Sequence, residues 1–238
     1  MTGRIPLISE IFGPVIQGEG PRAGEPTIFV RTATCDFRCS WCDTLYAVEP
    51  SNRDDWTLME GCDVLERIIA LAGDSRPTIT LSGGNPALWD LGALCLLLHA
   101  RGHNIAIETQ ASIKPPSWHS MVDFVVLSPK PPSSGMPQRF EALQHWLTVR
   151  PDAAIKVVVG GEPDLDFLGE VKLLARSMGF DGLIYAQPMN PDGAMDTWRD
   201  ELMALYNALA RDVIARGWTD VRVLPQLHVL AEGGGKGI

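Results

Sequence analysis

The amino-acid sequence predicts an α/β fold built around a parallel sheet. From residue 75 onward, short runs rich in β-branched residues alternate with longer helical patterns. The strand-like runs are almost entirely apolar, which is typical of strands whose two faces are both covered by helices. Six or seven such units fit either an open, doubly wound sheet or a barrel with fewer than eight strands.

Each predicted element follows from its local pattern. The strands are β-branched runs between turn-forming residues, and the helices carry apolar residues three or four positions apart, as Leu91, Leu94 and Leu98 do. Pro163 marks the start of one helix, and Gly179 follows its end. The predicted strands are residues 27–31, 78–81, 105–107, 124–127, 155–159, 183–186 and 221–224. The predicted helices are residues 64–71, 88–100, 140–149, 165–178 and 198–216.

The composition excludes several classes of protein. The chain has 238 residues, of which 45% are hydrophobic, and no break or long linker divides it, so residues 1–238 are expected to form a single domain. It lacks a long apolar run and a basic segment leading into an apolar block, so neither a membrane span nor a secretion signal is expected. With a formal net charge of −9, it is not expected to bind nucleic acid, which requires Lys and Arg. These features favour a location in the reducing cytoplasm.

Three of the five cysteines lie close together in a loop after the first strong strand. Cys35, Cys39 and Cys42 are spaced so that the chain can wrap around one polynuclear centre. No fourth cysteine or histidine is near, although a structural zinc site and a fully cysteine-ligated cluster both need four ligands. The spacing therefore favours an iron–sulfur cluster with one open iron; a zinc site completed from elsewhere and three core cysteines are the alternatives. Cys62 and Cys95 are predicted to be buried, unreactive thiols.

Polar residues follow several of the predicted strands. In parallel α/β folds the carboxyl ends of the strands share one rim, where ligands bind. The residues at these ends are therefore expected to converge, although they are far apart in the sequence. They are Cys35 and its neighbours, Ser82 to Gly84, Glu108 and Thr109, Ser128 to Lys130, and Gln187.

The Cys-x3-Cys-x2-Cys loop resembles that of the radical S-adenosylmethionine enzymes. Residues 82–86, Ser-Gly-Gly-Asn-Pro, are similar to the Gly-Gly-Glu-Pro segment of that superfamily. The resemblance implies a 4Fe–4S cluster whose open iron binds S-adenosylmethionine, and reductive cleavage of this cofactor into methionine and a 5′-deoxyadenosyl radical. Asn85 stands where the superfamily has an acidic residue, so its contact with the cofactor's ammonium would come from an uncharged amide.

Further segments resemble the 7-carboxy-7-deazaguanine synthase family: residues 12–20 (FGPVIQGEG), 42–44 (CDT), 128–130 (SPK), 187–189 (QPM) and 225–228 (PQLH). The resemblance implies an incomplete β/α barrel of the TIM type with about six units. It also implies a lyase that converts 6-carboxy-5,6,7,8-tetrahydropterin to 7-carboxy-7-deazaguanine with loss of ammonia, on the route to queuosine and other 7-deazapurines. Mg²⁺, a homodimer and an electron donor of the flavodoxin or ferredoxin type belong to the same expectation.

The resemblance also implies roles for individual residues. Cys35, Cys39 and Cys42 would bind the cluster, and Thr44 would bind Mg²⁺. The residues expected to bind the pterin are Ile16, Gln17, Gly18, Glu19, Arg31, Ser82, His228 and the chain end Ile238. The residues expected to bind S-adenosylmethionine are Gly84, Glu108, Ser128, Pro129, Lys130, Gln187, Pro188, Met189 and Asn190. Arg31 would face the substrate carboxylate, and Glu108 would accept the ribose hydroxyls.

Two other functions compete with this prediction. One is another radical enzyme, such as an activase that makes a glycyl radical on a partner protein. The other is a binding module without catalytic activity in which the three cysteines help to hold a zinc ion.

Overall fold

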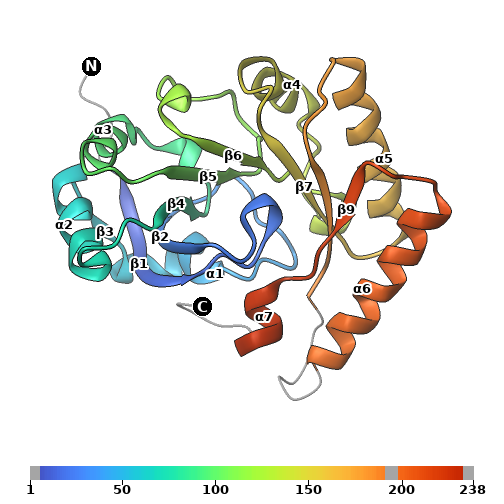
Figure 1. Ribbon diagram of the computed structural model, residues 1–238, viewed down its shortest axis with the longest axis horizontal. Helices are drawn as coiled ribbons and strands as arrows, with labels where there is room; N and C mark the ends of the chain where they lie inside the picture. Colours follow the sequence, from blue (N-terminus) through green and yellow to red (C-terminus); the bar gives the residue numbers. More distant parts are fainter. Residues whose placement is uncertain (1–5, 191–197, 233–238) are drawn as a thin grey trace.

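The computed structural model describes residues 6–190 and 198–232, and in these residues a single sheet of nine strands has helices along its outer side (Figure 1). The strands are β1 (Leu7–Ile16), β2 (Pro26–Thr32), β3 (Thr57–Leu58), β4 (Thr78–Gly83), β5 (Ile105–Thr109), β6 (Phe124–Leu127), β7 (Ala154–Val159), β8 (Ile184–Pro188) and β9 (Val221–Val223). Their order in the sheet is β3-β1-β2-β4-β5-β6-β7-β8-β9. From β2 to β9 in this order all pairs are parallel, whereas β1 and β3 are antiparallel additions.

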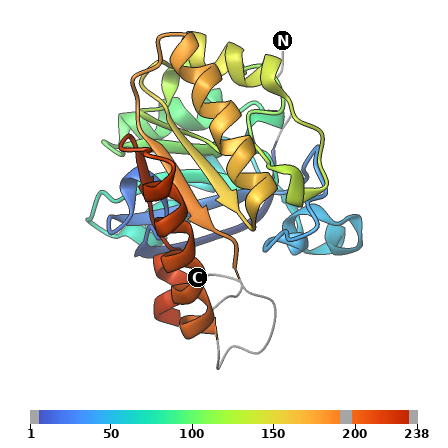
Figure 2. The ribbon, with the colours of Figure 1, turned by 90° about the vertical axis from the view of Figure 1, so that its right-hand side faces the viewer.

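The sheet does not close into a barrel, because β3 and β9 stand at opposite ends of the strand order. The expected incomplete β/α barrel is therefore confirmed. Helices cover its outer side from α2 and α3 at the left of Figure 1, through α4, to α5 and α6 at the right, and Figure 2 shows α5 running alongside β7. The helices are α1 (Leu45–Val48), α2 (Gly61–Ala72), α3 (Gly92–Ala100), α4 (Phe140–Val149), α5 (Glu162–Ser177), α6 (Trp198–Ala215) and α7 (Leu227–Glu232). None of the helices in the described residues has the length and apolar character needed to cross a membrane.

One of the connections between the parallel strands lacks an α-helix. Between β5 and β6 the chain forms only a short 3-10 turn, His119–Met121, after Pro115 and Pro116. Prolines have no amide hydrogen for a helix interior, so the segment stays irregular. The buried guanidinium of Arg150 replaces the missing helical bonds, donating to the carbonyls of His119 at 2.9 Å and Val122 at 3.0 Å.

In the parallel part of the sheet, the observed strands and helices agree in number and order with those predicted from the sequence. All seven predicted strands are present with ends within two residues, and the five predicted helices correspond to α2 to α6. The helix expected from residue 88 begins only at Gly92, because Pro86–Leu88 forms a 3-10 turn and the carboxylate of Asp90 accepts the amide hydrogen of Gly92 at 3.1 Å. The sequence did not predict β1, β3, α1 and α7.

Of the two cysteines outside the loop, which were both predicted to be buried, only one is buried. Cys95 is fully buried in α3, in a core that also holds Ile28, Leu81 and Trp146. Cys62, expected to be buried, is instead exposed at the start of α2. The prediction was wrong there because α2 begins at Gly61, three residues earlier than expected, so Cys62 lies in its first turn with an exposed side chain.

The start of α5 braces the loop that carries the three cysteines. Asp164 is 1% exposed, and its carboxylate accepts the amide hydrogens of Gly160 at 2.8 Å and Ser133 at 2.9 Å. Ser133 in turn accepts hydrogen bonds from the hydroxyl of Ser40 at 2.7 Å and the indole of Trp41 at 3.0 Å. The carboxylate of Asp164, at the start of the helix α5 that follows β7, therefore fixes the cysteine loop, which follows β2.

We expect Asp164→Ala to lower the free energy of unfolding by about 2 to 3 kcal/mol, because two amide hydrogens lose a charged acceptor. Urea unfolding of the purified protein measures this cost. Asp166→Ala is the matched control on the same helix, since its side chain is 63% exposed, and it should cost no more than about 0.5 kcal/mol. Equal losses of unfolding free energy in the two variants would contradict the proposed stabilisation of the loop by Asp164.

Candidate active site

A cavity of about 320 Å³ lies at the carboxyl ends of the parallel strands, where ligands bind in folds of this type. Its volume suits a small molecule. The loops after β1, β2, β4, β5, β6 and β8 line it together with the start of α7. The predicted site residues that line the cavity are Ile16, Gln17, Gly18, Glu19, Arg31, Cys35, Cys39, Cys42, Thr44, Ser82, Gly84, Glu108, Ser128, Lys130, Gln187, Asn190 and His228.

Three predicted residues are placed differently, and a fourth is not tested. Pro129 and Pro188 are buried and do not line the cavity, and neither does Met189, which packs beside Gly160. Successive residues of an extended chain point to opposite sides, so Gln187 faces the cavity and Pro188 faces away from it. Ile238 lies outside the described residues.

The cysteine loop presents three half-buried thiols to the cavity. Burial raises the pKa of Cys35, and it raises that of Cys39 to about 11 although the charge of Lys130 acts in the opposite direction. Thiols with raised pKa values carry protons near neutral pH, so a bound metal would displace these protons. The side-chain amide of Gln110 donates to the sulfur of Cys35 at 3.2 Å, a type of contact that tunes iron–sulfur ligands.

The donor set fits a cluster better than a single ion. In residues 6–190 and 198–232, no three Cys, His, Asp or Glu side chains converge closely enough to hold one metal ion. Thiolates that each bind a different iron of a cubane cluster do not need to meet at one point. Three thiols on one cavity wall, with further polar groups opposite them, therefore suit a 4Fe–4S cluster with one iron facing the cavity.

Gly83 and Gly84 allow the end of β4 to pack directly against the cysteine loop. Gly83 has a φ of 121°, and a Cβ atom there would overlap the backbone of Thr32. A Cβ atom at Gly84 would overlap the carbonyl oxygen of Thr34, one residue before the first cysteine. The glycines are thus required by the contact between two backbones, in addition to any approach of a ligand.

Asn85 is fully buried, and its amide has no hydrogen-bonding capacity left. The nitrogen donates to Asp36 at 2.9 Å and to Ser112 at 3.2 Å. The oxygen accepts from the hydroxyl of Thr109 at 2.9 Å and the amide of Ala87 at 3.2 Å. A side-chain amide has two donors and two acceptor positions, so all four are used. Asn85 does not line the cavity, and the expected contact with a cofactor ammonium has no free acceptor here.

A network of charges occupies the other side of the cavity. Lys156 in β7 is 3% exposed, forms an ion pair with Glu108 at 2.5 Å and a second one with Glu19. The other carboxylate oxygen of Glu19 accepts a hydrogen bond from Gln226. Burial alone would raise the pKa of Glu19, but the charges of Lys156 and His228 outweigh it and lower this pKa to about 2. Glu19 is therefore an ionised carboxylate near neutral pH.

Arg31 is held in a fixed orientation at the end of β2. Its Nε donates to the carboxylate of Glu10 at 2.7 Å, and the hydroxyl of Tyr46 donates to the same oxygen at 2.6 Å. The guanidinium also lies 5.4 Å from the ring centre of Phe12. A half-buried guanidinium with one edge already fixed is a suitable group to meet a carboxylate.

Three polar atoms of the cavity wall are buried without a hydrogen-bond partner. They are Ser82 Oγ, Asn190 Oδ1 and Gln226 Oε1. Apart from His119 Nδ1, they are the only such side-chain atoms in the described part of the chain. Because an unpaired buried polar atom is costly, their concentration in one cavity indicates a polar ligand that pairs with them.

The sequence did not single out Lys156, Gln110 or Gln226. Lys156 is a lysine inside an apolar strand, which is an unusual position and was the available signal. Gln110 directly follows β5, and Gln226 lies in the segment 225–228, in which the resemblance implies a role only for His228.

Comparisons with known proteins show which family the chain is similar to. No protein-family model matches the chain. Over their full lengths, it is 37% identical to 7-carboxy-7-deazaguanine synthase of Bacillus subtilis, and it is 35% identical to that of Bacillus cereus over 99% of each chain. The crystal structure of QueE from Escherichia coli matches with a TM-score of 0.70 and 27% identity over 94% of each chain. SuiB of Streptococcus suis shares the fold, with a TM-score of 0.58 and 14% identity over 86% of this chain and 51% of its own.

These likenesses, the open barrel and the three-cysteine loop together define the chain as a radical S-adenosylmethionine enzyme. Within that class, the two Bacillus relatives match along essentially the whole chain and share one name, so they identify a particular family. The chain belongs to the 7-carboxy-7-deazaguanine synthase family.

We expect Asn85→Asp to destabilise the protein by about 3 kcal/mol at pH 8, because it places two carboxylates side by side, one of them buried. Burial and the charge of Asp36 would raise the pKa of the new carboxyl group in the folded state. The folded state then holds that proton more tightly than the unfolded chain, so the loss should grow as the pH rises from about 4 to 8. Urea unfolding at several pH values measures it.

The matched control is Asn104→Asp, which makes the same chemical change at an exposed position. It should cost no more than about 0.5 kcal/mol at any of these pH values. An Asn85→Asp variant as stable as this control would contradict the assignment of all four hydrogen bonds.

Proposed function

We propose that this enzyme converts 6-carboxy-5,6,7,8-tetrahydropterin to 7-carboxy-7-deazaguanine and ammonia; the names of its relatives give the same product. The loss of one ammonia accounts for every atom of the substrate that the product lacks. The observation that carries the proposal is the cavity itself. Three thiols, a fixed guanidinium and an ionised carboxylate all line this one cavity, which has the size of a small-molecule site.

In this proposal Cys35, Cys39 and Cys42 hold a 4Fe–4S cluster. With S-adenosylmethionine bound, the cluster supplies the one-electron chemistry that removes a hydrogen atom from the substrate. The chain's own residues bind and orient the two organic molecules. Ser128, Lys130, Gln187 and Asn190 would surround S-adenosylmethionine, and Lys130 is already fixed by a hydrogen bond of 3.2 Å to the hydroxyl of Ser128.

The pterin would lie between Arg31 and Glu19. The guanidinium of Arg31 suits the substrate carboxylate, with which it can form paired hydrogen bonds. The carboxylate of Glu19 accepts only, and each of its oxygens keeps a second lone pair after bonding Lys156 and Gln226. Two parallel N–H groups, as on the aminopyrimidinone ring of a pterin, match that arrangement.

Mg²⁺ would be bound through the hydroxyl of Thr44, which lines the cavity 3.6 Å from the sulfur of Cys42. Hydroxyl, carboxylate and water oxygens are ligands that Mg²⁺ prefers.

The proposed electron donor is a small flavodoxin or ferredoxin, and the exposed residues Asp36, Arg38 and Ser40 of the cysteine loop give it access. The proposed assembly is a cytoplasmic homodimer of single-domain subunits, because the open sheet leaves an edge strand at each end; size-exclusion chromatography with light scattering tests this.

The activity test is the incubation of anaerobically reconstituted, reduced protein with S-adenosylmethionine and the pterin. Mass spectrometry should show a product lighter than the substrate by one ammonia. A protein that carries the cluster and cleaves S-adenosylmethionine but leaves the pterin unchanged would favour the other radical enzymes over this function. Zinc without iron or sulfide would favour the binding module.

Removal of any of the three loop cysteines should abolish both the brown colour and turnover, because two thiolates cannot hold the cluster. Cys35→Ala, Cys39→Ala and Cys42→Ala are compared with Cys62→Ala and Cys95→Ala by iron and sulfide analysis. The last two should retain the cluster, although Cys95→Ala will lose some stability because that side chain is fully buried. Full iron content in any loop variant would remove that cysteine from the ligand set.

Thr44→Ala should keep the cluster but lose most of the stimulation of turnover by Mg²⁺, because it removes the proposed protein ligand. The rate is measured as a function of Mg²⁺ concentration with and without a chelator. Thr57→Ala, at an exposed position in β3, is the control and should respond to Mg²⁺ like the wild type. An unchanged Mg²⁺ dependence of Thr44→Ala would refute the ligand role.

A further inference from the structure

Lys156 occupies a position that normally belongs to an apolar side chain. It lies in β7 between Ile155 and Val157, both fully buried, and it is itself 2% exposed as a whole residue. Burying an ammonium is costly unless it is paired with anions. The sequence therefore places a charge where packing alone would favour Val or Ile, which indicates a role for the charge.

The ammonium has two carboxylate partners, which come from different parts of the sequence. Glu108 projects from β5, and Glu19 lies in the segment that follows β1. Burial would lower the pKa of Lys156, but the charges of Glu108 and Glu19 outweigh this effect and raise it. Lys156 is thus permanently charged, and it neutralises one of two carboxylates that would otherwise repel each other in a confined space.

Glu19 is positioned almost entirely by groups from other elements. Lys156 binds one oxygen, Gln226 binds the other, and the charge of His228 also acts on it. Its own backbone amide donates to the side chain of Gln17 at 3.1 Å, which fixes the turn. Of these groups, Lys156 is the one that forms an ion pair with Glu19.

We propose that Lys156 is a positioning residue for the substrate, which keeps the Glu19 carboxylate ionised and oriented for the pterin ring while Glu108 holds the ammonium in place. This inference rests on the proposed function for the identity of the ligand. It assigns to Lys156 no contact with the substrate or the cofactor. It also predicts what happens without the ammonium: burial and the nearby charge of Glu108 would then raise the pKa of Glu19 into the working pH range.

The test compares substrate binding by anaerobic, cluster-loaded wild type with that of Lys156→Met, which fills the same volume without charge, and Lys156→Arg, which keeps the charge. Equilibrium dialysis with the pterin gives the affinity between pH 6 and pH 8.5. We expect Lys156→Met to bind about tenfold more weakly at pH 8.5. Relative to wild type, its affinity should fall by a further factor of about three to ten toward pH 6, as Glu19 takes up a proton.

Two variants separate charge from packing. Lys156→Arg should bind within about threefold of wild type, with the same pH profile, although it is the less isosteric change. Glu19→Gln should bind weakly at every pH, with a constant ratio to wild type, because it has no charge to lose.

A Lys156→Met variant whose affinity ratio does not change with pH would overturn the proposal, as would an arginine variant no better than methionine. The proposed function is judged separately, because it stands or falls on turnover of the pterin by the wild type. If Lys156→Met does not fold, Lys156→Gln provides the same neutral comparison.

A second readout needs no substrate. Without the ammonium the folded state holds the Glu19 proton more tightly than the unfolded chain, so the stability lost in Lys156→Met should be greater at pH 8 than at pH 5. Urea unfolding of the cluster-free protein measures the loss. A loss that is equal at both pH values would show a packing role only and would contradict the proposal.

Discussion

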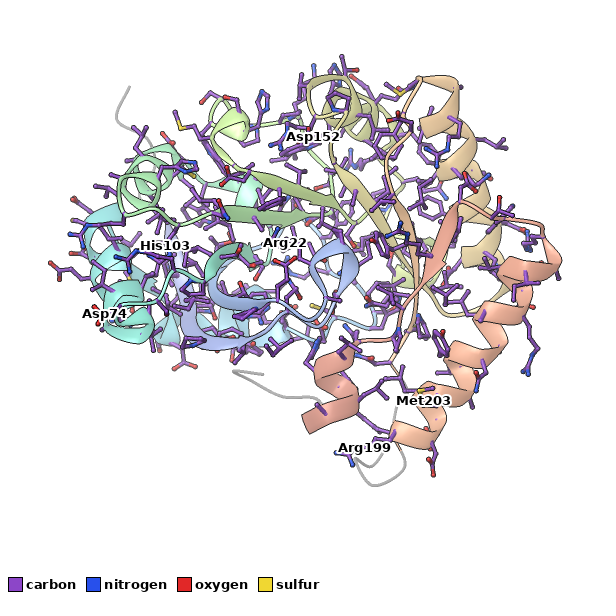
Figure 3. All side chains as sticks on the ribbon, viewed as in Figure 1. Arg22, Asp74, His103, Asp152, Arg199 and Met203 are labelled. Atoms are coloured by element: carbon purple, nitrogen blue, oxygen red, sulfur yellow. The ribbon has the colours of Figure 1, made fainter. Side chains whose placement is uncertain are left out.

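The pairing of one buried ammonium with two carboxylates determines how this cavity is arranged. Lys156 bonds Glu19 across 137 positions of the sequence, and Gln226 bonds the same carboxylate across 207. These contacts join the first strand region, the middle of the sheet and the segment before α7. They exist only when both ends of the open sheet are in place, so the substrate side of the cavity depends on the complete fold. Arg199 in α6, labelled in Figure 3, adds a hydrogen bond of 2.7 Å to the Ala231 carbonyl near the end of α7.

The cysteine side is built in a different way, from backbone packing and from hydrogen bonds to the carboxylates of Asp36 and Asp164. Gly83 and Gly84 let the end of β4 approach the loop, and Asn85 fixes Asp36 within it. Asp164 supports the same loop from α5 through Ser133. The three thiols thus line the same cavity as the charged groups of Glu19 and Lys156.

The sequence predicts those parts of the molecule whose signals are local. The parallel strands are continuous apolar runs, and all seven were found; the cysteine loop is defined by spacing alone. β1 was missed because Gly13 and Pro14 interrupt its pattern and its pairing with β2 contains two irregularities. Lys156 was missed because its ion-pair partners are distant in the sequence, and they cannot be identified from a single lysine within a strand. Pro129 and Pro188 were included with their neighbours, although alternation along an extended chain turns them away from the cavity.

The most direct measurement of this account is a crystal structure of the anaerobic protein with S-adenosylmethionine and the pterin bound. The account predicts the Lys156 ammonium within about 3.2 Å of both Glu19 and Glu108, with Glu19 accepting hydrogen bonds from the aminopyrimidinone ring. It also predicts that the loop cysteines ligate three irons while the fourth faces the cofactor. A pterin bound away from Glu19, or an ammonium turned away from both carboxylates, would contradict the central claim.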